Sequence, residues 1–141
     1  MMCRVINAYI LGEQLLDCCF RNVLMDILLS MQDCALLVGG SNVDLIYMFT
    51  TELSPMRKLA VDWFIWLHHN GNYHCQVGLW TPTYLPLPLE FLHNVVDACI
   101  ERRQPNNFSK PVQAPWDKDP CDYHSHQDGQ KCNLNNTAEL R

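Results

Sequence analysis

The residues best suited to chemistry lie near the C-terminus. Two cysteines and two histidines stand in the pattern Cys121-x2-His124-x-His126-x5-Cys132. Two thiolates and two imidazoles suit tetrahedral Zn²⁺, and a bound ion would fold a segment that has little apolar content of its own. The spacing differs from that of standard zinc fingers, because the His-x-His step and the loop are short. Zinc is therefore the one candidate cofactor, and the alternative is a solvated tail with polar histidines and reduced cysteines.

A second cluster contains His68, His69, His74 and Cys75 beside a turn. Paired histidines at a helix end usually stabilise the helix C-terminus or pack on aromatic rings, and a metal role is the less favoured alternative. The chain has no G-x-S-x-G, Gly-rich phosphate loop or H-E-x-x-H motif. Its cysteines and histidines allow many pairs, but no pattern places one pair beside an orienting third group. We therefore predict that the chain is not an enzyme.

Aromatic side chains suggest a different kind of site. Trp63, Phe64 and Trp66 lie close together, and Trp80 follows in a loop. Aromatic residues are favoured at the energetic centres of protein interfaces, so these four are candidate partner-binding residues. The alternative is interior packing. It is favoured for Trp63 and Trp66, because a helix that is apolar on most faces is normally covered by its own chain.

Helices are expected to carry the aromatic residues at 63–66. Apolar residues recur at helical spacing in five segments, 2–15, 17–32, 41–52, 54–68 and 88–103. We therefore predict an all-α fold of about five packed helices.

Local signals mark where several of these helices begin. Asp17 is a candidate N-cap, Ser41 and Asp44 fit a capping pattern, and Ser54-Pro55 places a capping residue before a proline at the first helical position. Apolar stripes then predict the buried faces. One stripe contains Phe20, Val23, Leu24, Ile27 and Leu28, and another contains Leu89, Leu92, Val95, Val96 and Cys99.

Two segments lack a helical pattern. Residues 69–87 hold a turn at 70–72 and several prolines beside aromatic residues, which predicts an irregular loop. From residue 104 onward the chain is polar with few aliphatic residues, which predicts a disordered tail. We therefore divide the chain into a helical interaction module, 1–103, and a flexible polar tail, 104–141, that contains the candidate metal site.

Charge and hydropathy exclude several classes of function. The net charge is −5, from 10 Lys and Arg against 15 Asp and Glu, so the chain lacks the basic face that binds nucleic acid or acidic membranes. No segment approaches the length of a membrane span, and the N-terminus does not resemble a signal peptide. The eight cysteines include no C-x-x-C pair. We expect an intracellular protein, in cytoplasm or nucleus, that is not secreted and keeps its thiols reduced.

Several short runs are similar to one known family. Residues 54–62, SPMRKLAVD, followed by Trp66, resemble an S-P-L-R-R-L-L-V-D…W segment of fungal BTB/POZ proteins. Residues 88–92, PLEFL, resemble the family's L-P-x-E-F-L helix start, and residues 9–15, YILGEQL, resemble its Y-x-L-A-D-K-L helix. Two shorter matches are Arg21-Asn22, similar to an L-R-N step, and residues 121–126, CDYHSH, similar to a C-x-Y-H-x-H ending.

The resemblance implies a scaffold or adaptor that works by protein–protein interaction. In the family these helices follow a BTB core, and neither that core nor its dimer-forming helix is in this chain, so family dimerisation is not carried over. If the helices normally lean on such a core, an apolar face is exposed, and the chain should self-associate or need a partner protein. The candidate face contains Trp63, Phe64 and Trp66. The alternatives are a small zinc-binding protein that works through its tail, and a truncated fragment without independent function.

Overall fold

The computed structural model describes residues 2–31, 40–69, 87–101 and 114–126. Every regular element in these ranges is helical, which confirms the predicted all-α class. Most of the Pro-rich loop, with Trp80, lies outside the described residues. The elements are α1 (Met2–Gln14), α2 (Cys18–Ser30), α3 (Gly40–Phe49), α4 (Pro55–His69), α5 (Leu89–Glu101), α6 (Pro115–Lys118) and the short 3-10 helix η3 (Pro120–Tyr123).

Local sequence accounts for two of the helix starts. Asp17 caps α2, because its carboxylate accepts a hydrogen bond of 2.9 Å from the backbone N–H of Phe20. Helix α4 begins at Pro55, directly after Ser54, as predicted. Helix α3 differs from its prediction, because it begins at Gly40 and already includes Ser41 in its first turn.

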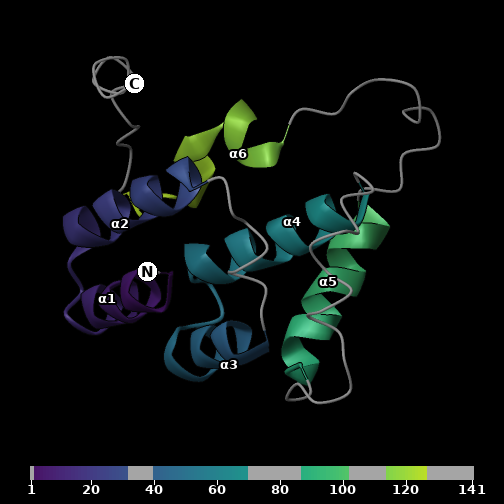
Figure 1. Ribbon diagram of the computed structural model, residues 1–141, viewed down its shortest axis with the longest axis horizontal. Coiled ribbons are helices and arrows are strands. Elements are labelled where there is room, and N and C mark those ends of the chain that lie inside the picture. Colours follow the sequence, from purple (N-terminus) through teal and green to yellow (C-terminus); the bar gives the residue numbers. More distant parts are fainter. Residues whose placement is uncertain (1, 32–39, 70–86, 102–113, 127–141) are drawn as a thin grey trace.

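Helix α4 lies at the centre of the molecule (Figure 1). The α1–α2 hairpin lies on one side of it and α5 on the other, while α3 and the α6–η3 segment cover two further sides. The middle of α4 is apolar in nearly every direction, so it supplies much of the core. Its buried apolar side chains are Met56, Leu59, Ala60, Val61 and Trp63.

Aromatic rings link α4 to its neighbours. The Phe91 ring of α5 packs edge-to-face against Tyr47 of α3, at 5.5 Å between ring centroids, and against Phe64 of α4, at 5.3 Å. Trp116 of α6 packs in the same way against Trp63 at 5.8 Å and Trp66 at 5.9 Å. Each such pair contributes roughly 0.5–1.5 kcal/mol beyond the burial of its area.

The buried face of α2 differs in part from the predicted stripe. Leu24 and Leu28 are buried as expected, and Met25 is buried beside them. Val23 and Ile27 instead face solvent, together with Phe20. The stripe was wider than the face that α1 and the core can cover, so α2 turns Met25 inward and leaves one edge of the stripe exposed.

The prediction for the buried face of α5 is wrong. Phe91 is fully buried and Val95 is half-buried, whereas the other four residues of the predicted stripe, Leu89, Leu92, Val96 and Cys99, are exposed. Polar partners explain this rotation. Turning Phe91 inward lets Glu90 pair with Arg57 of α4 and lets Asn94 donate a hydrogen bond of 2.9 Å to the Tyr47 hydroxyl.

Truncation of two residues on α2 tests its orientation. Leu28 is 0% exposed and Val23 is 57% exposed. Leu28→Ala should lower the free energy of unfolding by about 2–5 kcal/mol, because it removes core contacts and leaves a cavity. Val23→Ala, the control, should cost less than about 0.5 kcal/mol. Urea denaturation measures both, and similar losses for the two variants would contradict the helix phase.

Candidate functional site

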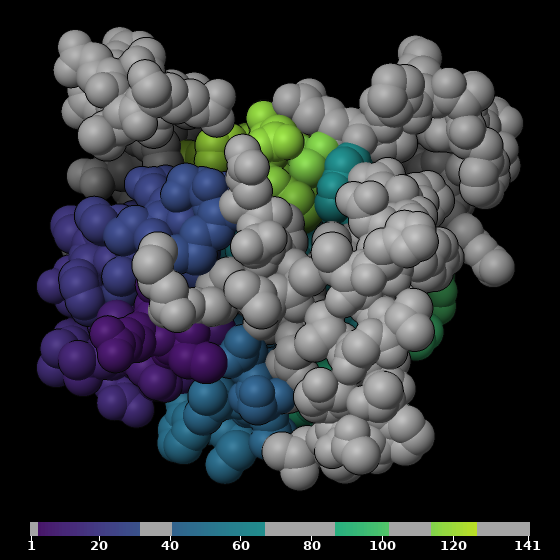
Figure 2. Space-filling view, viewed as in Figure 1, coloured from purple at the N-terminus to yellow at the C-terminus, as the bar shows by residue number. Residues whose placement is uncertain are grey.

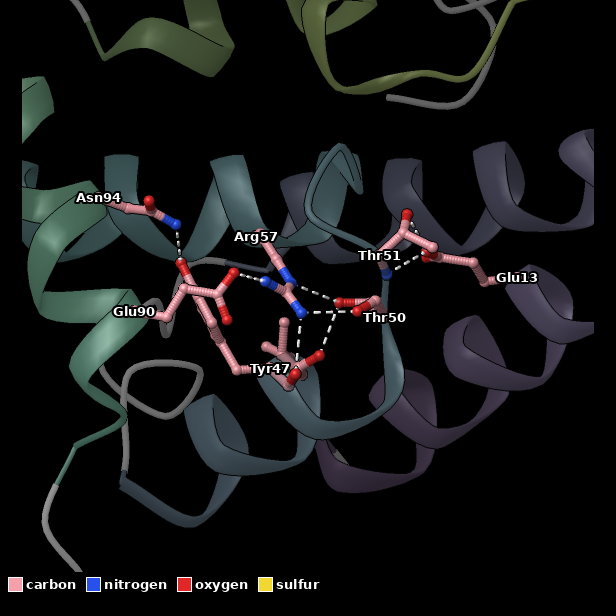
Figure 3. Close-up of polar contacts among 8 residues, drawn as sticks. Glu13, Tyr47, Thr50, Thr51, Arg57, Glu90 and Asn94 are labelled. Carbon is pink, nitrogen blue, oxygen red and sulfur yellow. Dashed lines mark hydrogen bonds and ion pairs between the residues drawn. The ribbon is translucent and has the colours of Figure 1, made fainter.

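A buried polar network surrounds Arg57 (Figure 3). Its guanidinium donates to the Thr50 hydroxyl at 3.1 Å, to the carbonyls of Tyr47 and Thr50 at 2.8 and 2.6 Å, and to the Glu90 carboxylate. The two carbonyls lie at the C-terminal end of α3, where helix carbonyls lack intrahelical partners. Arg57 therefore caps α3 and joins it to α5.

Glu13 of α1 forms the second part of this network. One of its carboxylate oxygens accepts from the backbone N–H and hydroxyl of Thr51, at 2.9 and 3.0 Å, and the other accepts from the Ser54 hydroxyl at 2.7 Å. Glu13 is buried and both of its oxygens are engaged. Like Arg57, it holds the connection between α3 and α4 in place, which is a structural role.

Among the described residues, three titratable groups have shifted pKa values, and in none of the three does the shift favour chemistry near neutral pH. Burial is the main reason that the pKa of Tyr9 rises to about 12, and burial also raises the pKa of Tyr47. The pKa of the Cys19 thiol is raised chiefly by its hydrogen bond with Cys18. A raised thiol pKa reduces the fraction of nucleophilic thiolate, which is the opposite of what a catalytic cysteine needs.

An open cavity of about 360 Å³ lies between α5 and the start of α4. Leu53, Arg57, Glu52 and Glu101 are among its lining residues. The cavity is lined largely by polar and charged groups, whereas small-molecule sites are predominantly apolar with a few converging polar groups. It therefore resembles a surface recess beside α5 more than a substrate pocket.

Part of the predicted tail packs against the helices. Tyr123 is buried, and its hydroxyl donates a hydrogen bond of 2.5 Å to Asp62 of α4. Asn22 of α2 donates to the Ser125 carbonyl at 3.0 Å and accepts from its N–H at 2.8 Å. The boundary at 103/104 therefore does not separate packed from unpacked residues. Two aromatic rings, Trp116 and Tyr123, supply apolar area that a count of aliphatic residues misses.

The candidate metal ligands are only partly brought together. The Cys121 Sγ lies 3.0 Å from the His126 Nε2, so these two side chains are neighbours. His124 is turned to α2, where its Nε2 lies 2.9 Å from the Asp26 carboxylate. Cys132 lies outside the described residues. Within those residues no three His, Cys, Asp or Glu side chains form a group that could hold a metal ion.

Three of the predicted partner-binding residues lie on α4 and contribute wholly or partly to the interior. Trp63 is fully buried, and Trp66 and Phe64 are half-buried against Trp116 and Phe91. Interior packing, the alternative in the sequence analysis, is thus what the structure shows for Trp63. Trp80 lies outside the described residues, as do the side chains of the His68, His69, His74 and Cys75 cluster.

Exposed apolar residues gather on two elements that flank α4, the α1–α2 hairpin and α5 (Figure 1). Figure 2 shows the atoms of α1 and α2 as the purple to blue side of the molecule. The hairpin face consists of Leu11, Leu15, Leu16, Phe20, Val23 and Ile27. The α5 face consists of Leu89, Leu92, Val96 and Ile100. Sequence periodicity found most of these residues but assigned several of them to the interior.

Comparison with known proteins finds no matching family model, no matching curated protein and no matching solved structure. In the part of the chain that the structure describes, no helix has the length and apolar character needed to cross a membrane. The function therefore has to be argued from the surfaces of this chain.

Docking of residues 114–126 should not require metal. Several backbone N–H groups there, including those of Asp117, Lys118 and Asp122, donate hydrogen bonds within the segment. In protein treated with a chelator, hydrogen exchange at these amides should be slow, and Trp116→Ala should accelerate it because the segment loses its aromatic anchor. The control, Lys118→Ala, changes an exposed side chain in the same turn and should leave exchange slow. Protection that appears only after zinc is added would contradict this prediction.

Loss of Arg57 should destabilise the whole chain. Arg57→Met should cost about 2–4 kcal/mol, because it leaves buried acceptors at the end of α3 without donors. Lys58→Met, next to it on α4, changes an exposed side chain and should cost less than about 1 kcal/mol. Thermal or urea denaturation gives both values. Equal costs would mean that the network around Arg57 is not a structural centre.

Proposed function

We propose that this chain is a non-enzymatic protein-interaction module, a scaffold or adaptor element similar to the helices that follow the core in BTB/POZ proteins. We further propose that its hairpin face pairs with the same face of a second copy. The observation that carries the proposal is the group of six exposed apolar residues on the α1–α2 hairpin.

The two helices pack closely where Phe20 of α2 meets Gly12 of α1. A Cβ atom at Gly12 of α1 would lie only 2.9 Å from the Phe20 ring of α2, so glycine allows that ring to lie directly against α1. Leu11 lies on α1, and Leu15 follows the end of that helix and donates its N–H to the Leu11 carbonyl. Val23 and Ile27 continue from Phe20 along α2. Exposed apolar side chains therefore lie on both helices of the hairpin and on the turn between them.

The turn between the helices adds a leucine in an unfavourable conformation. Leu16 has φ 55°, and the N–H groups of Leu16 and Asp17 bond back to the carbonyls of Glu13 and Gly12. Hydrogen bonds of this kind commonly end a helix, and the residue with positive φ there is usually glycine, because a side chain disfavours positive φ. Leu16 is 83% exposed, so no contact within the described residues offsets this cost. A contact with another molecule would offset it.

The size and charge of the hairpin face suit a second copy. Its six residues are between 39% and 83% exposed, so the face offers several large apolar side chains to a partner. None of the six is charged, so pairing the face with itself opposes no like charges. Two hairpins packed face to face would form a four-helix layer, a common way to bury such stripes.

Zinc binding through the tail is the second candidate function. One observation favours it, the 3.0 Å contact between Cys121 and His126, which places two suitable donors together. Metal analysis of protein purified without a metal-affinity tag tests it. One zinc per chain, lost in Cys121→Ser, would favour zinc binding over the interaction module.

Analytical ultracentrifugation tests the pairing. The wild-type chain should form a dimer at tens of micromolar, and Val23→Glu should raise the dimer dissociation constant by at least about tenfold, because the new charge is buried in the dimer. Val96→Glu is the matched control. It places the same charge at a similarly exposed valine on α5 and should leave the dimer intact.

Circular dichroism should show both variants as helical as the wild type, since both valines are exposed in the single chain. A well-folded wild-type monomer at these concentrations would reject the pairing. So would a dimer that Val23→Glu leaves unchanged.

A further inference from the structure

Helix α5 is apolar on two opposite sides. Phe91 and Val95 point to the core, whereas Leu89, Val96 and Ile100 lie on the opposite side of the helix, at positions i, i+7 and i+11. A helix that is apolar on both sides is normally covered on both. The outer side is open, with Ile100 at 62% and Val96 at 54% exposed.

The spacing on this outer side suits another helix. Leu89, Leu92 and Val96 follow the i, i+3, i+7 pattern by which helices present apolar anchors to one another, and Ile100 extends it by one more turn. The row spans most of α5, long enough to contact about three turns of a second helix. The shape of the α5 face therefore matches a helical ligand.

Acidic groups border this row on one side. Asp97 and Glu101 lie one turn apart on α5, and all three charged residues of this helix are acidic. Glu90 pairs with Arg57, but neither Asp97 nor Glu101 has an ion-pair partner among the described residues. The row thus has an acidic edge whose charge is not neutralised within the described part of the chain.

The cavity beside α5 extends this acidic edge. Glu52 and Glu101 both line it, with the side chain of Leu53 at 94% exposed. Its two basic residues are engaged elsewhere, Arg57 with Glu90 and Lys58 with Asp122. A lysine or arginine side chain from a ligand could lay its apolar stem along Leu53 and place its cation between the two carboxylates.

We infer that the α5 face, with its acidic edge, is a docking site for an amphipathic helix of another protein that carries aliphatic side chains on one face and Lys or Arg along one edge. Charge complementarity selects this ligand over a second copy of α5, because two copies would oppose acidic edges. The inference uses a surface separate from the hairpin face and does not depend on pairing through it.

Two synthetic helical peptides test the inference. Both are about 20 residues long and carry the same leucine face, one with lysine along the edge and the other with glutamate. Fluorescence anisotropy with the full chain should show the lysine peptide binding at least about tenfold more tightly, by an amount that decreases as salt is added.

Charge reversal and truncation of exposed residues sharpen the test. Asp97→Lys combined with Glu101→Lys should reverse the preference, so that the glutamate peptide binds more tightly. Val96→Ser combined with Ile100→Ser should lower the affinity for the lysine peptide by at least about tenfold. Val23→Glu, which changes the hairpin face alone, is the matched control and should leave peptide binding unchanged.

Failure of this inference is distinguishable from failure of the proposed pairing, because the Val23→Glu chain is tested in both experiments. Equal affinity for the two peptides, absence of binding to the lysine peptide, or a preference that charge reversal does not alter would each overturn the docking site. A change in dimer formation alone would not affect it.

Discussion

Between Met56 and Trp63 only Lys58 is exposed to solvent. The other elements of the structure are placed so that they cover this stretch of α4. No single neighbour can enclose a helix that is buried in almost every direction. Helix α3 and α5 cover one part with the rings of Tyr47 and Phe91, and the α6–η3 segment covers another with Trp116 and Tyr123. Enclosing α4 therefore requires chain segments that lie before and after it in the sequence.

The covering of α4 must also provide hydrogen-bond partners for the buried guanidinium of Arg57. A guanidinium in the core is stable only if its donors are satisfied, and the free carbonyls at the end of α3 together with the Glu90 carboxylate satisfy it. Because Glu90 must reach Arg57, α5 is held in one rotation, with Phe91 inward. The same rotation leaves Val96 and its aliphatic neighbours outside. The exposed α5 face is thus a consequence of the buried charge.

Local signals and long-range contacts explain which features the sequence could predict. The starts of α2 and α4 depend on Asp17 and on Ser54-Pro55, whose effects reach only a few residues, and these were predicted correctly. The inward face of α5 depends on Arg57, more than thirty residues away, and two apolar sides of one helix look equally suitable from periodicity alone. The sequence did not predict the packing of residues 114–126 for a related reason. Trp116 anchors this segment by packing on aromatic rings of α4, which lie far away in the sequence.

The two exposed faces differ in a way that assigns them different partners. The hairpin face is uncharged, so it can meet its own copy without repulsion, whereas the acidic edge of α5 opposes a second α5 and favours a basic ligand. Helix α4 separates the two faces, so occupying one leaves the other open (Figure 1). If hairpin faces pair, each dimer presents two α5 faces. A partner with two basic helices would then bind far more tightly than one with a single helix, because its second contact forms within the same complex. Self-pairing and partner binding would in that case reinforce each other without any change in the fold.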